Sequence, residues 1–180
     1  IEIEPKIAGL LCSAILSDTL MFRSPTCTPL DRMAAEELAK IAGLNIREYA
    51  AEMFRSSSRL RDRSMDELFH MDFKYFQVQD RKIAITSVSE DELSGIRDKM
   101  LEYMESCLKT SGLSMQFAML TNIIEEKTEL LYVGKGAQEL VHMAFKKECG
   151  ENSVVLPGVV SRKKQMVTPL LGAMEEEAGL

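Results

Sequence analysis

The sequence predicts an α/β protein, and three features of its pattern support this prediction. Beyond residue 63, short runs rich in β-branched and aromatic residues alternate with longer amphipathic segments, as in a sheet with helices on its faces. The segments before residue 55 show helical periodicity only. Hydrophobic residues make up 46% and charged residues 28% of the 180 residues, a composition that argues against disorder over the whole length.

The first segments predict three helices. The first covers residues 5–16 and begins with a proline, which suits a first helical turn. The second begins after Thr28, a good N-cap, with Pro29 in the first helical position, and it ends at Gly43. The third covers about residues 45–54. A helical subdomain therefore opens the chain.

Residues 55–63 differ in composition from the segments on either side. They contain three serines, four arginines and one aspartate, with a single apolar residue. Such a segment cannot bury a face, and we interpret it as a flexible interdomain linker.

The segment after the linker predicts an independent α/β unit. Ser64 and Glu67 have capping-box spacing and open a short helix. The expected elements that follow are strands over 73–78 and 82–88, a helix that begins with a second capping box at 89–92 and ends near 109, strands over 115–124 and 129–133, a helix over 136–147, a strand over 153–160 and a last helix from about 165. This order predicts a mixed sheet with helices on its faces.

Composition and charge exclude several classes of protein. The chain has 22 Lys and Arg against 28 Asp and Glu, so a general nucleic-acid binder is not expected. No apolar run approaches the ~18 residues of a membrane span, and no signal peptide is visible. The four cysteines form no C-x-x-C pair, which argues against a zinc site. Three of them lie in apolar or helical stretches, which predicts reduced, buried thiols in a cytoplasmic protein. The chain does not begin with Met, and we expect it to be part of a longer protein.

Asp18 is the first candidate functional residue. It follows an apolar helix, where the partial negative charge of the helix C-terminus disfavours an anion. Asp18 could cap backbone groups of the next loop, or it could be a rigidly held carboxylate ligand for a hard cation.

The second candidate is a run of three cations, Arg162, Lys163 and Lys164, at a predicted strand-to-helix junction. Backbone N–H groups at such a junction, together with adjacent cations, can bind a phosphate, although three solvated cations would give the same pattern. Lys74 alternates with aromatic residues on a predicted strand. The pattern alone favours an outward-facing position for Lys74. The two histidines, His70 and His142, have no partner at metal-ligand spacing, and we expect structural or surface roles for them.

Three segments resemble the family II inorganic pyrophosphatases, the manganese-dependent enzymes of the DHH phosphoesterase superfamily. Residues 17–28 (SDTLMFRSPTCT) resemble the signature near the end of the DHH catalytic domain. Residues 160–165 (VSRKKQ) resemble the substrate-binding signature of the DHHA2 domain, and residues 71–74 (MDFK) the segment after the linker. The family's upstream His-x-x-x-Asp-x-Asp and Asp-His-His motifs do not occur here, and Asn122 stands where Asp is more often expected.

The resemblance implies a domain organisation and a set of site residues. It implies that residues 1–54 form the end of a DHH-type α/β catalytic domain, 55–63 a hinge and 64–180 a mixed-sheet α/β DHHA2 substrate-binding domain. The implied roles are a manganese ligand for Asp18, substrate binding for Lys74, and both catalysis and substrate binding for Arg162 and Lys163.

The implied activity is hydrolysis of pyrophosphate to two phosphates by a two-metal mechanism in a cytoplasmic enzyme. The resemblance implies two Mn²⁺ ions, with Co²⁺ as a possible substitute and Mg²⁺ bound to the substrate. It also implies that the full protein is a homodimer formed through its catalytic domain, with no nucleic-acid or membrane partner. With one recognisable metal ligand, this chain alone should be nearly inactive. Two alternatives remain open. One is another DHH phosphoesterase acting on short polyphosphates or small nucleotides, and the other is a non-catalytic regulatory module that binds an anion through Arg162 and Lys163.

Overall fold

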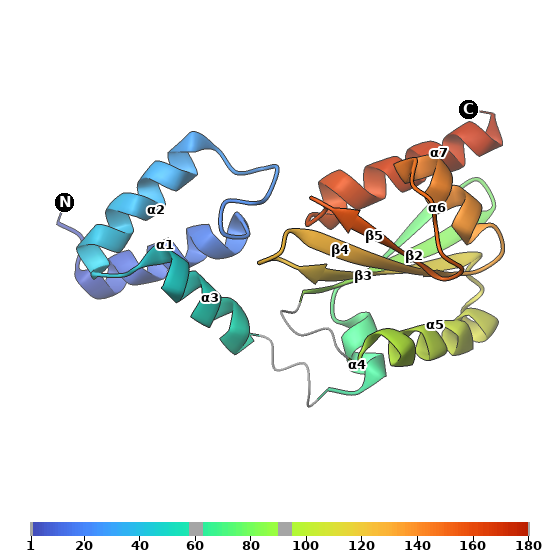
Figure 1. Ribbon diagram of the computed structural model, residues 1–180, viewed down its shortest axis with the longest axis horizontal. Coiled ribbons are helices and arrows are strands. Elements are labelled where there is room, and N and C mark those ends of the chain that lie inside the picture. The colour runs from blue at the N-terminus through green and yellow to red at the C-terminus, as the bar shows by residue number, and fades with distance from the viewer. Residues whose placement is uncertain (1, 58–62, 90–94, 180) are drawn as a thin grey trace. The chain divides into compact units, whose positions relative to one another are not determined.

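The computed structural model describes residues 2–57, 63–89 and 95–179, apart from the side chains of residues 55–57 and 89 (Figure 1). The chain divides into two compact units, residues 1–59 and 60–180. Each unit has its own hydrophobic core, and each is described by itself below.

The first unit consists of α1 (Pro5–Asp18), α2 (Pro29–Ala42) and α3 (Ile46–Ser57). Its core is built largely from small residues, which allow the helices to approach closely: Cys12, Leu16, Ala35, Ala39 and Ala50. The predicted start and end of α2 are confirmed, since Thr28 and Asp31 form a reciprocal capping box and Gly43 ends the helix in the left-handed conformation with φ 68°.

Two helices of the first unit are longer than the sequence predicts. α1 continues to Asp18 instead of ending at Leu16, and α3 continues to Ser57. Residues 55–57, which we had placed in the linker, are therefore helical. Residues 58–62 of that expected linker lie outside the described residues.

The second unit is built on a mixed five-stranded sheet, which confirms the predicted fold class. Its strands lie in sequence order, β1-β2-β3-β4-β5, and all neighbours are antiparallel except β2 and β3. Their bounds are β1 (Phe73–Val78), β2 (Arg81–Ser89), β3 (Met115–Asn122), β4 (Lys127–Val133) and β5 (Ser153–Pro157). The parallel pair requires a crossover, and α5 (Arg97–Ser111) lies within that connection.

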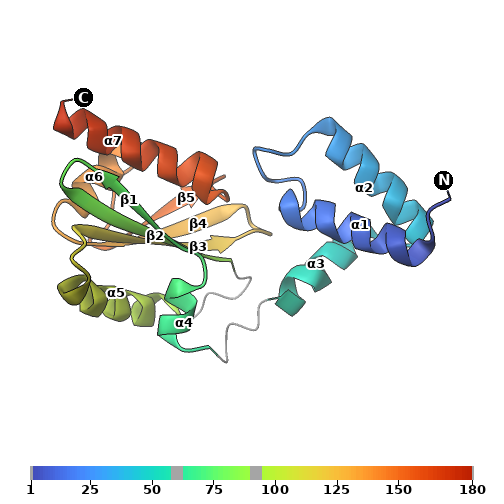
Figure 2. The ribbon, with the colours of Figure 1, turned by 180° about the vertical axis from the view of Figure 1, so that it is seen from behind.

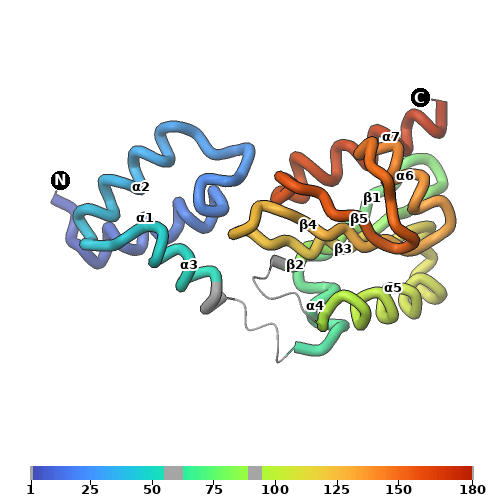
Figure 3. Tube along the Cα trace, in the orientation of Figure 1, coloured from blue at the N-terminus to red at the C-terminus, as the bar shows by residue number. Residues whose placement is uncertain are grey.

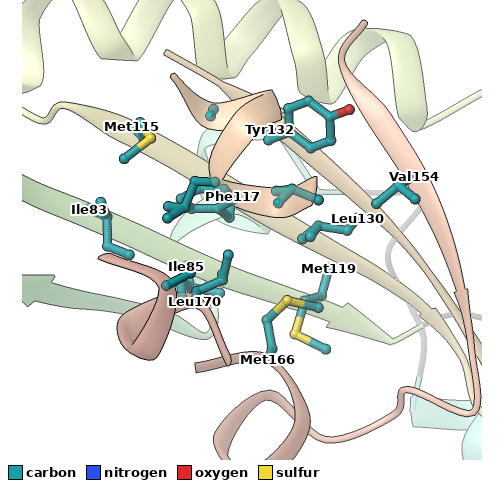
Figure 4. Packing of buried hydrophobic residues seen from close by; sticks show 14 of the residues in the cluster. Ile83, Ile85, Met115, Phe117, Met119, Leu130, Tyr132, Val154, Met166 and Leu170 are labelled. Carbon is teal, nitrogen blue, oxygen red and sulfur yellow. The ribbon is translucent and has the colours of Figure 1, made fainter. Parts of the chain in front are cut away.

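Helices cover both faces of the sheet, so the second unit has three layers (Figures 1 and 2). α4 (Met65–His70) and α5 pack on one face, over a core that includes Phe69, Met104 and Leu120. α6 (Ala137–Phe145), a π-helical turn η2 (Arg162–Val167) and α7 (Thr168–Ala178) pack on the other. Figure 4 shows Ile85 and Met119 of the sheet beside Met166 and Leu170, the buried residues that fix η2 and α7 to it.

The largest error of the sequence prediction concerns the start of α5. The groups that would form the capping box expected at residues 89–92 lie outside the described part of the chain; the main chain of Ser89 ends β2 and pairs with Thr121 of β3. Residues 90–94 lie outside the described part of the chain. Gly95 has φ 91°, which is incompatible with a helix at that position, and α5 begins at Arg97.

Three elements of the second unit, β3, β5 and α6, end earlier than expected. β3 ends at Asn122, whose Oδ1 accepts a hydrogen bond of 2.8 Å from the Glu125 N–H and so closes the turn to β4. This contact assigns Asn122 a structural role. β5 ends at Pro157, before Gly158 with φ 76°. α6 ends at Phe145, because Lys146 adopts a left-handed cap conformation.

Candidate anion-binding site

The strand register brings several loops to one end of the sheet. The first residues of β1 and β4 lie at the same end as the last residues of β2, β3 and β5. The segment after β5 is fixed there: Gly158 N–H donates to the Glu126 carbonyl at 2.6 Å, and Thr128 Oγ1 donates to the Val159 carbonyl, also at 2.6 Å. These two hydrogen bonds attach the chain just before residue 162 to the β3–β4 turn and to β4, and so give it a rigid support.

Gln165 holds the same segment from its other side. Its Oε1 accepts hydrogen bonds from the N–H groups of Val160 at 3.1 Å and Ser161 at 3.0 Å, and its Nε2 donates to the Gly158 carbonyl at 2.7 Å. One side-chain amide therefore satisfies three backbone groups of a loop that has no strand partner of its own. The sequence prediction did not include Gln165.

The turn η2 carries the predicted cationic run. Ser161 is its N-cap, with a side chain that accepts from the Lys164 N–H. The first N–H groups of a helix carry partial positive charge and favour anions. Short π-helical segments frequently occur at functional sites. Lys163 and Lys164 are exposed and form no ion pair with any other described residue. This end of η2 is therefore suited to an anion.

Arg162 differs from the two lysines because its guanidinium is held in place. Its side chain is only 15% exposed, and Nη2 lies 2.8 Å from Oδ1 of Asp72. Nη1 donates to the main-chain carbonyl of the same aspartate. The two residues are 90 positions apart in the chain, so no local sequence signal predicts this pair.

Lys74 lies on the face of the sheet that η2 and α7 cover. Side chains alternate along β1: Phe76 and Val78 pack into the core beneath α7, whereas Phe73 packs against α4 and α5. Lys74 shares the parity of Phe76 and is exposed, and Asp72, the partner of Arg162, is two residues before it. The structure therefore brings Lys74, Arg162 and Lys163 to the same face and the same end of the second unit.

Two ion pairs fix the direction of the segment that carries these cations. Arg162 pairs with Asp72 at the start of β1, and Glu177 near the end of α7 pairs with Arg81 at the start of β2. α7 packs beside β1 (Figure 3). Because both ends of the segment are attached to the β1–β2 hairpin, the position of η2 relative to Lys74 is set by the fold.

Asp18 belongs to the first unit and is the exposed last residue of α1. The next residues form an uncommon left-handed turn, with φ 50° at Leu20, 54° at Met21 and 66° at Phe22. Thr19, not Asp18, caps this turn: its Oγ1 donates to the Ile15 carbonyl at 2.7 Å and accepts from the Phe22 N–H at 3.2 Å. Asp18 forms no side-chain hydrogen bond with any described residue, so the capping role considered for it is not observed.

The described residues do not form a complete metal site. They contain no group of three or more His, Cys, Asp or Glu side chains that could hold a metal ion, and one exposed carboxylate is too few ligands for a manganese or zinc centre. His70 lies beside Asp66, with its Nδ1 at 3.3 Å from Oδ1, and the His142 Nδ1 is 2.7 Å from the Lys147 carbonyl. These contacts agree with the structural roles expected for the histidines.

Two further predictions can be checked directly. All four cysteines are free thiols, as expected, but the expected burial is found only for Cys12, because Cys27, Cys107 and Cys149 are partly exposed. Among the residues described, no helix combines the length and the apolar character needed to cross a membrane.

The fold and the three cations Lys74, Arg162 and Lys163 define the second unit as a three-layer α/β domain with a candidate anion-binding turn. Comparison with known proteins places it more closely: the chain belongs to the DHHA2 domain family, whose family model matches residues 51–173. The resemblance inferred from the three sequence motifs is thereby confirmed at the level of the domain family.

Relatives and solved structures extend the similarity over nearly the whole chain. The chain is 40% identical over 173 residues to the manganese-dependent inorganic pyrophosphatase of Methanocaldococcus jannaschii, covering 94% of this chain and 56% of that protein. It is 42% identical over 166 residues to the cobalt-dependent inorganic pyrophosphatase of Clostridium perfringens, covering 91% of this chain and 30% of that protein.

A crystal structure from Methanococcus jannaschii, assigned to the family II inorganic pyrophosphatases, superposes with a TM-score of 0.79 at 39% identity. The match covers 96% of this chain and 57% of that one. It supports the fold described above. The chain thus spans little more than half the length of the Methanocaldococcus jannaschii protein and about a third of the Clostridium perfringens protein.

Proposed function

We propose that the protein containing this chain hydrolyses pyrophosphate to two phosphates, and that its second unit holds the substrate. The observation that carries this proposal is Arg162, whose guanidinium is fixed on Asp72 beside Lys74 and at the N-terminus of η2. Relatives named as manganese- and cobalt-dependent inorganic pyrophosphatases support the choice of substrate.

The three cations suit a substrate with two adjacent phosphates. Arg162 offers a planar fork that can bind two oxygens of one phosphate, whereas Lys74 and Lys163 act as movable point charges. Phosphoryl transfer depends mainly on positioning and on stabilising charge on the phosphate oxygens. We therefore assign substrate binding to Lys74 and both binding and charge stabilisation in the transition state to Arg162 and Lys163.

We propose that Asp18 is one ligand of a catalytic manganese ion, with the remaining ligands on residues outside this chain. Its exposed carboxylate, which is not used as a cap, is available for that role. A pair of such ions, when bound, would lower the pKa of a water molecule and polarise the phosphate, with Co²⁺ as a substitute and Mg²⁺ bound to the substrate. Within the residues described, Asp18 is the only part of that centre we assign.

The domain organisation is proposed on the same basis. Residues 1–54 would be the end of a DHH catalytic domain, 55–63 the interdomain hinge and 64–180 the DHHA2 domain. The division of the chain between Arg59 and Leu60 supports a boundary in this region. We also propose a cytoplasmic homodimer formed through the catalytic domain; the free cysteines support the compartment.

Substitution of Arg162 in the full protein tests the proposal. Arg162→Ala should lower the turnover of pyrophosphate about 100-fold, the usual loss when one preorganised charge-stabilising donor is removed. Manganese affinity should not change, because Arg162 is assigned to the substrate. Lys99→Ala, which removes an exposed cation on α5, is the control and should behave like the wild type.

Three outcomes would contradict the proposal. Loss of manganese binding in Arg162→Ala would remove Arg162 from the substrate site. A wild-type protein that acts faster on a short polyphosphate or a nucleotide than on pyrophosphate would favour another DHH phosphoesterase. Binding of pyrophosphate without turnover in the presence of Mn²⁺ would favour a regulatory anion-binding module.

A further inference from the structure

Asp72 occupies a fixed position between α4 and β1. Its main-chain carbonyl accepts a hydrogen bond of 3.2 Å from the Ser87 N–H of β2 as well as the bond from Arg162. Just before it, the Phe69 carbonyl accepts a bond of 2.6 Å from Thr86 Oγ1. The connection that carries Asp72 is thus attached to β2 at two points, and its carboxylate is presented from a rigid support.

Asp72 contacts Arg162 through two different groups. The carboxylate receives Nη2 at 2.8 Å and the main-chain carbonyl receives Nη1. Two contacts from separate nitrogens of a planar group define its orientation and not only its distance. Within the described part of the chain, Arg162 makes no other side-chain hydrogen bond, so Asp72 provides all the polar contacts that orient its guanidinium.

We infer that Asp72 is a positioning residue, which holds the Arg162 guanidinium in the orientation that receives the phosphate. This inference deepens the proposed function and rests on it. A long arginine side chain that is already ordered loses little freedom on binding, and a fixed donor fork is aligned with the phosphate oxygens before the substrate arrives.

The charge of Asp72 separates this role from a simple electrostatic one. A carboxylate beside Lys74 and Arg162 weakens the attraction of the site for an anion, although its 50% exposure screens part of that effect. If only net charge mattered, removing the carboxylate would improve binding. If orientation matters, removing the acceptor oxygens of the side chain impairs catalysis despite the gain in positive charge.

Three substitutions at this position give different expected results in the full protein with pyrophosphate and Mn²⁺. Asp72→Ala should lower kcat/KM about tenfold, because Arg162 loses one of its two contacts. Asp72→Asn keeps an oxygen acceptor of the same shape and should stay within about threefold of the wild type. Asp72→Glu keeps the charge but moves it by one methylene, and it should lose about as much as Asp72→Ala.

A double-mutant cycle with Arg162→Ala identifies the route by which Asp72 acts. If Asp72 works through Arg162, the Asp72→Ala/Arg162→Ala protein is no slower than Arg162→Ala alone. If Asp72→Ala fails to fold, judged by its unfolding midpoint, the contrast between the Asn and Glu variants decides instead. Asp98→Ala, which removes an exposed carboxylate 2.7 Å from Arg97, is the matched control and should leave kcat/KM unchanged.

The outcomes distinguish the inference from the function on which it rests. A wild-type protein that does not hydrolyse pyrophosphate overturns both. Wild-type hydrolysis with an unchanged or faster Asp72→Ala variant overturns the inference alone, and so does a double variant whose loss is the product of the two single losses. A folded Asp72→Glu variant with wild-type kcat/KM also overturns it.

Discussion

Gln165 is expected to hold the loop before η2 in place, and replacing it with methionine tests this directly. Methionine keeps the length of the side chain but removes all three hydrogen bonds to Gly158, Val160 and Ser161. Each such bond contributes about 1 kcal/mol net to the free energy of unfolding, so the upper bound is about 3 kcal/mol. Because Gln165 is only half-buried, water can replace part of the loss, and we expect about 2 kcal/mol.

Equilibrium urea unfolding, followed by far-UV circular dichroism, measures the global effect. With a slope of about 2 kcal/mol/M, a loss of about 2 kcal/mol lowers the urea midpoint by about 1 M. Amide hydrogen exchange measures the local effect, since the Val160 and Ser161 N–H groups should lose their protection in Gln165→Met. Both readouts follow from the same three contacts.

Gln138→Met provides the control for this experiment. The Gln138 amide donates to the Cys149 and Gly150 carbonyls at 3.2 and 3.1 Å, but its side chain is exposed. Water can replace both bonds, so its cost should stay below about 1 kcal/mol. Unchanged protection of Val160 and Ser161 in Gln165→Met would refute the reasoning, as would equal urea midpoints for the two variants.

Two further predictions concern a glycine and a helix cap. Gly134→Ala should destabilise the second unit by about 3 kcal/mol or more, because φ is 116° and a Cβ would lie 2.5 Å from the Ser114 carbonyl oxygen. Gly172→Ala in α7 should instead stabilise it by about 0.5–1 kcal/mol, because a Cβ there meets no neighbouring atom within 4 Å. Thermal unfolding measures both effects. The pKa of Glu67 is lowered from 4.5, mainly by a hydrogen bond from the Ser64 N–H and secondly by one from the Ser64 hydroxyl. The ionised Glu67 therefore stabilises the fold fully above pH 4.5, and this contribution is lost as the pH falls through the lowered pKa. The advantage of the wild type over Glu67→Gln in unfolding midpoint should therefore shrink between about pH 5 and pH 3.

One result would contradict each of these predictions. Equal effects of the two glycine substitutions would mean that the conformation at Gly134 is not required by the fold. A constant difference between the wild type and Glu67→Gln across the acidic range would mean that the charge of Glu67 does not take part in the cap.

Local chemistry explains which elements could be predicted from the sequence. The N-cap at Thr28 and the capping box at Ser64–Glu67 could be predicted because each depends on residues at most three positions apart. The helix expected to run from residues 89–92 was wrong in its start, since Gly95 has φ 91° and α5 begins only at Arg97.

The left-handed turn after Asp18 could not be predicted from the local sequence. Leu20, Met21 and Phe22 adopt positive φ although none is a glycine or an asparagine. Met21 and Phe22 pack against the core of the first unit, and Arg32 lies 4.6 Å from the centre of the Phe22 ring. Contacts with residues outside the turn hold this conformation, so no local residue pattern predicts it.

The candidate site was predictable only in its cations. The run that begins at Arg162 and the alternation around Lys74 are visible in the sequence. The residues that hold them are not: Asp72 is 90 positions from Arg162, and Gln165 acts through backbone groups rather than through a recognisable motif. Long-range partners of this kind become visible only when the strand register is known.

The strand order has a consequence for how the domain is made on the ribosome. Because each strand pairs only with its neighbours in sequence, the strands can pair one after another in the order in which they are synthesised. Asp72 and Lys74 then appear early, while Arg162 and Lys163 follow the last strand. A nascent chain would therefore have a complete sheet but only Lys74 of its three site cations, and the anion-binding turn would form only as the final helix closes over β1.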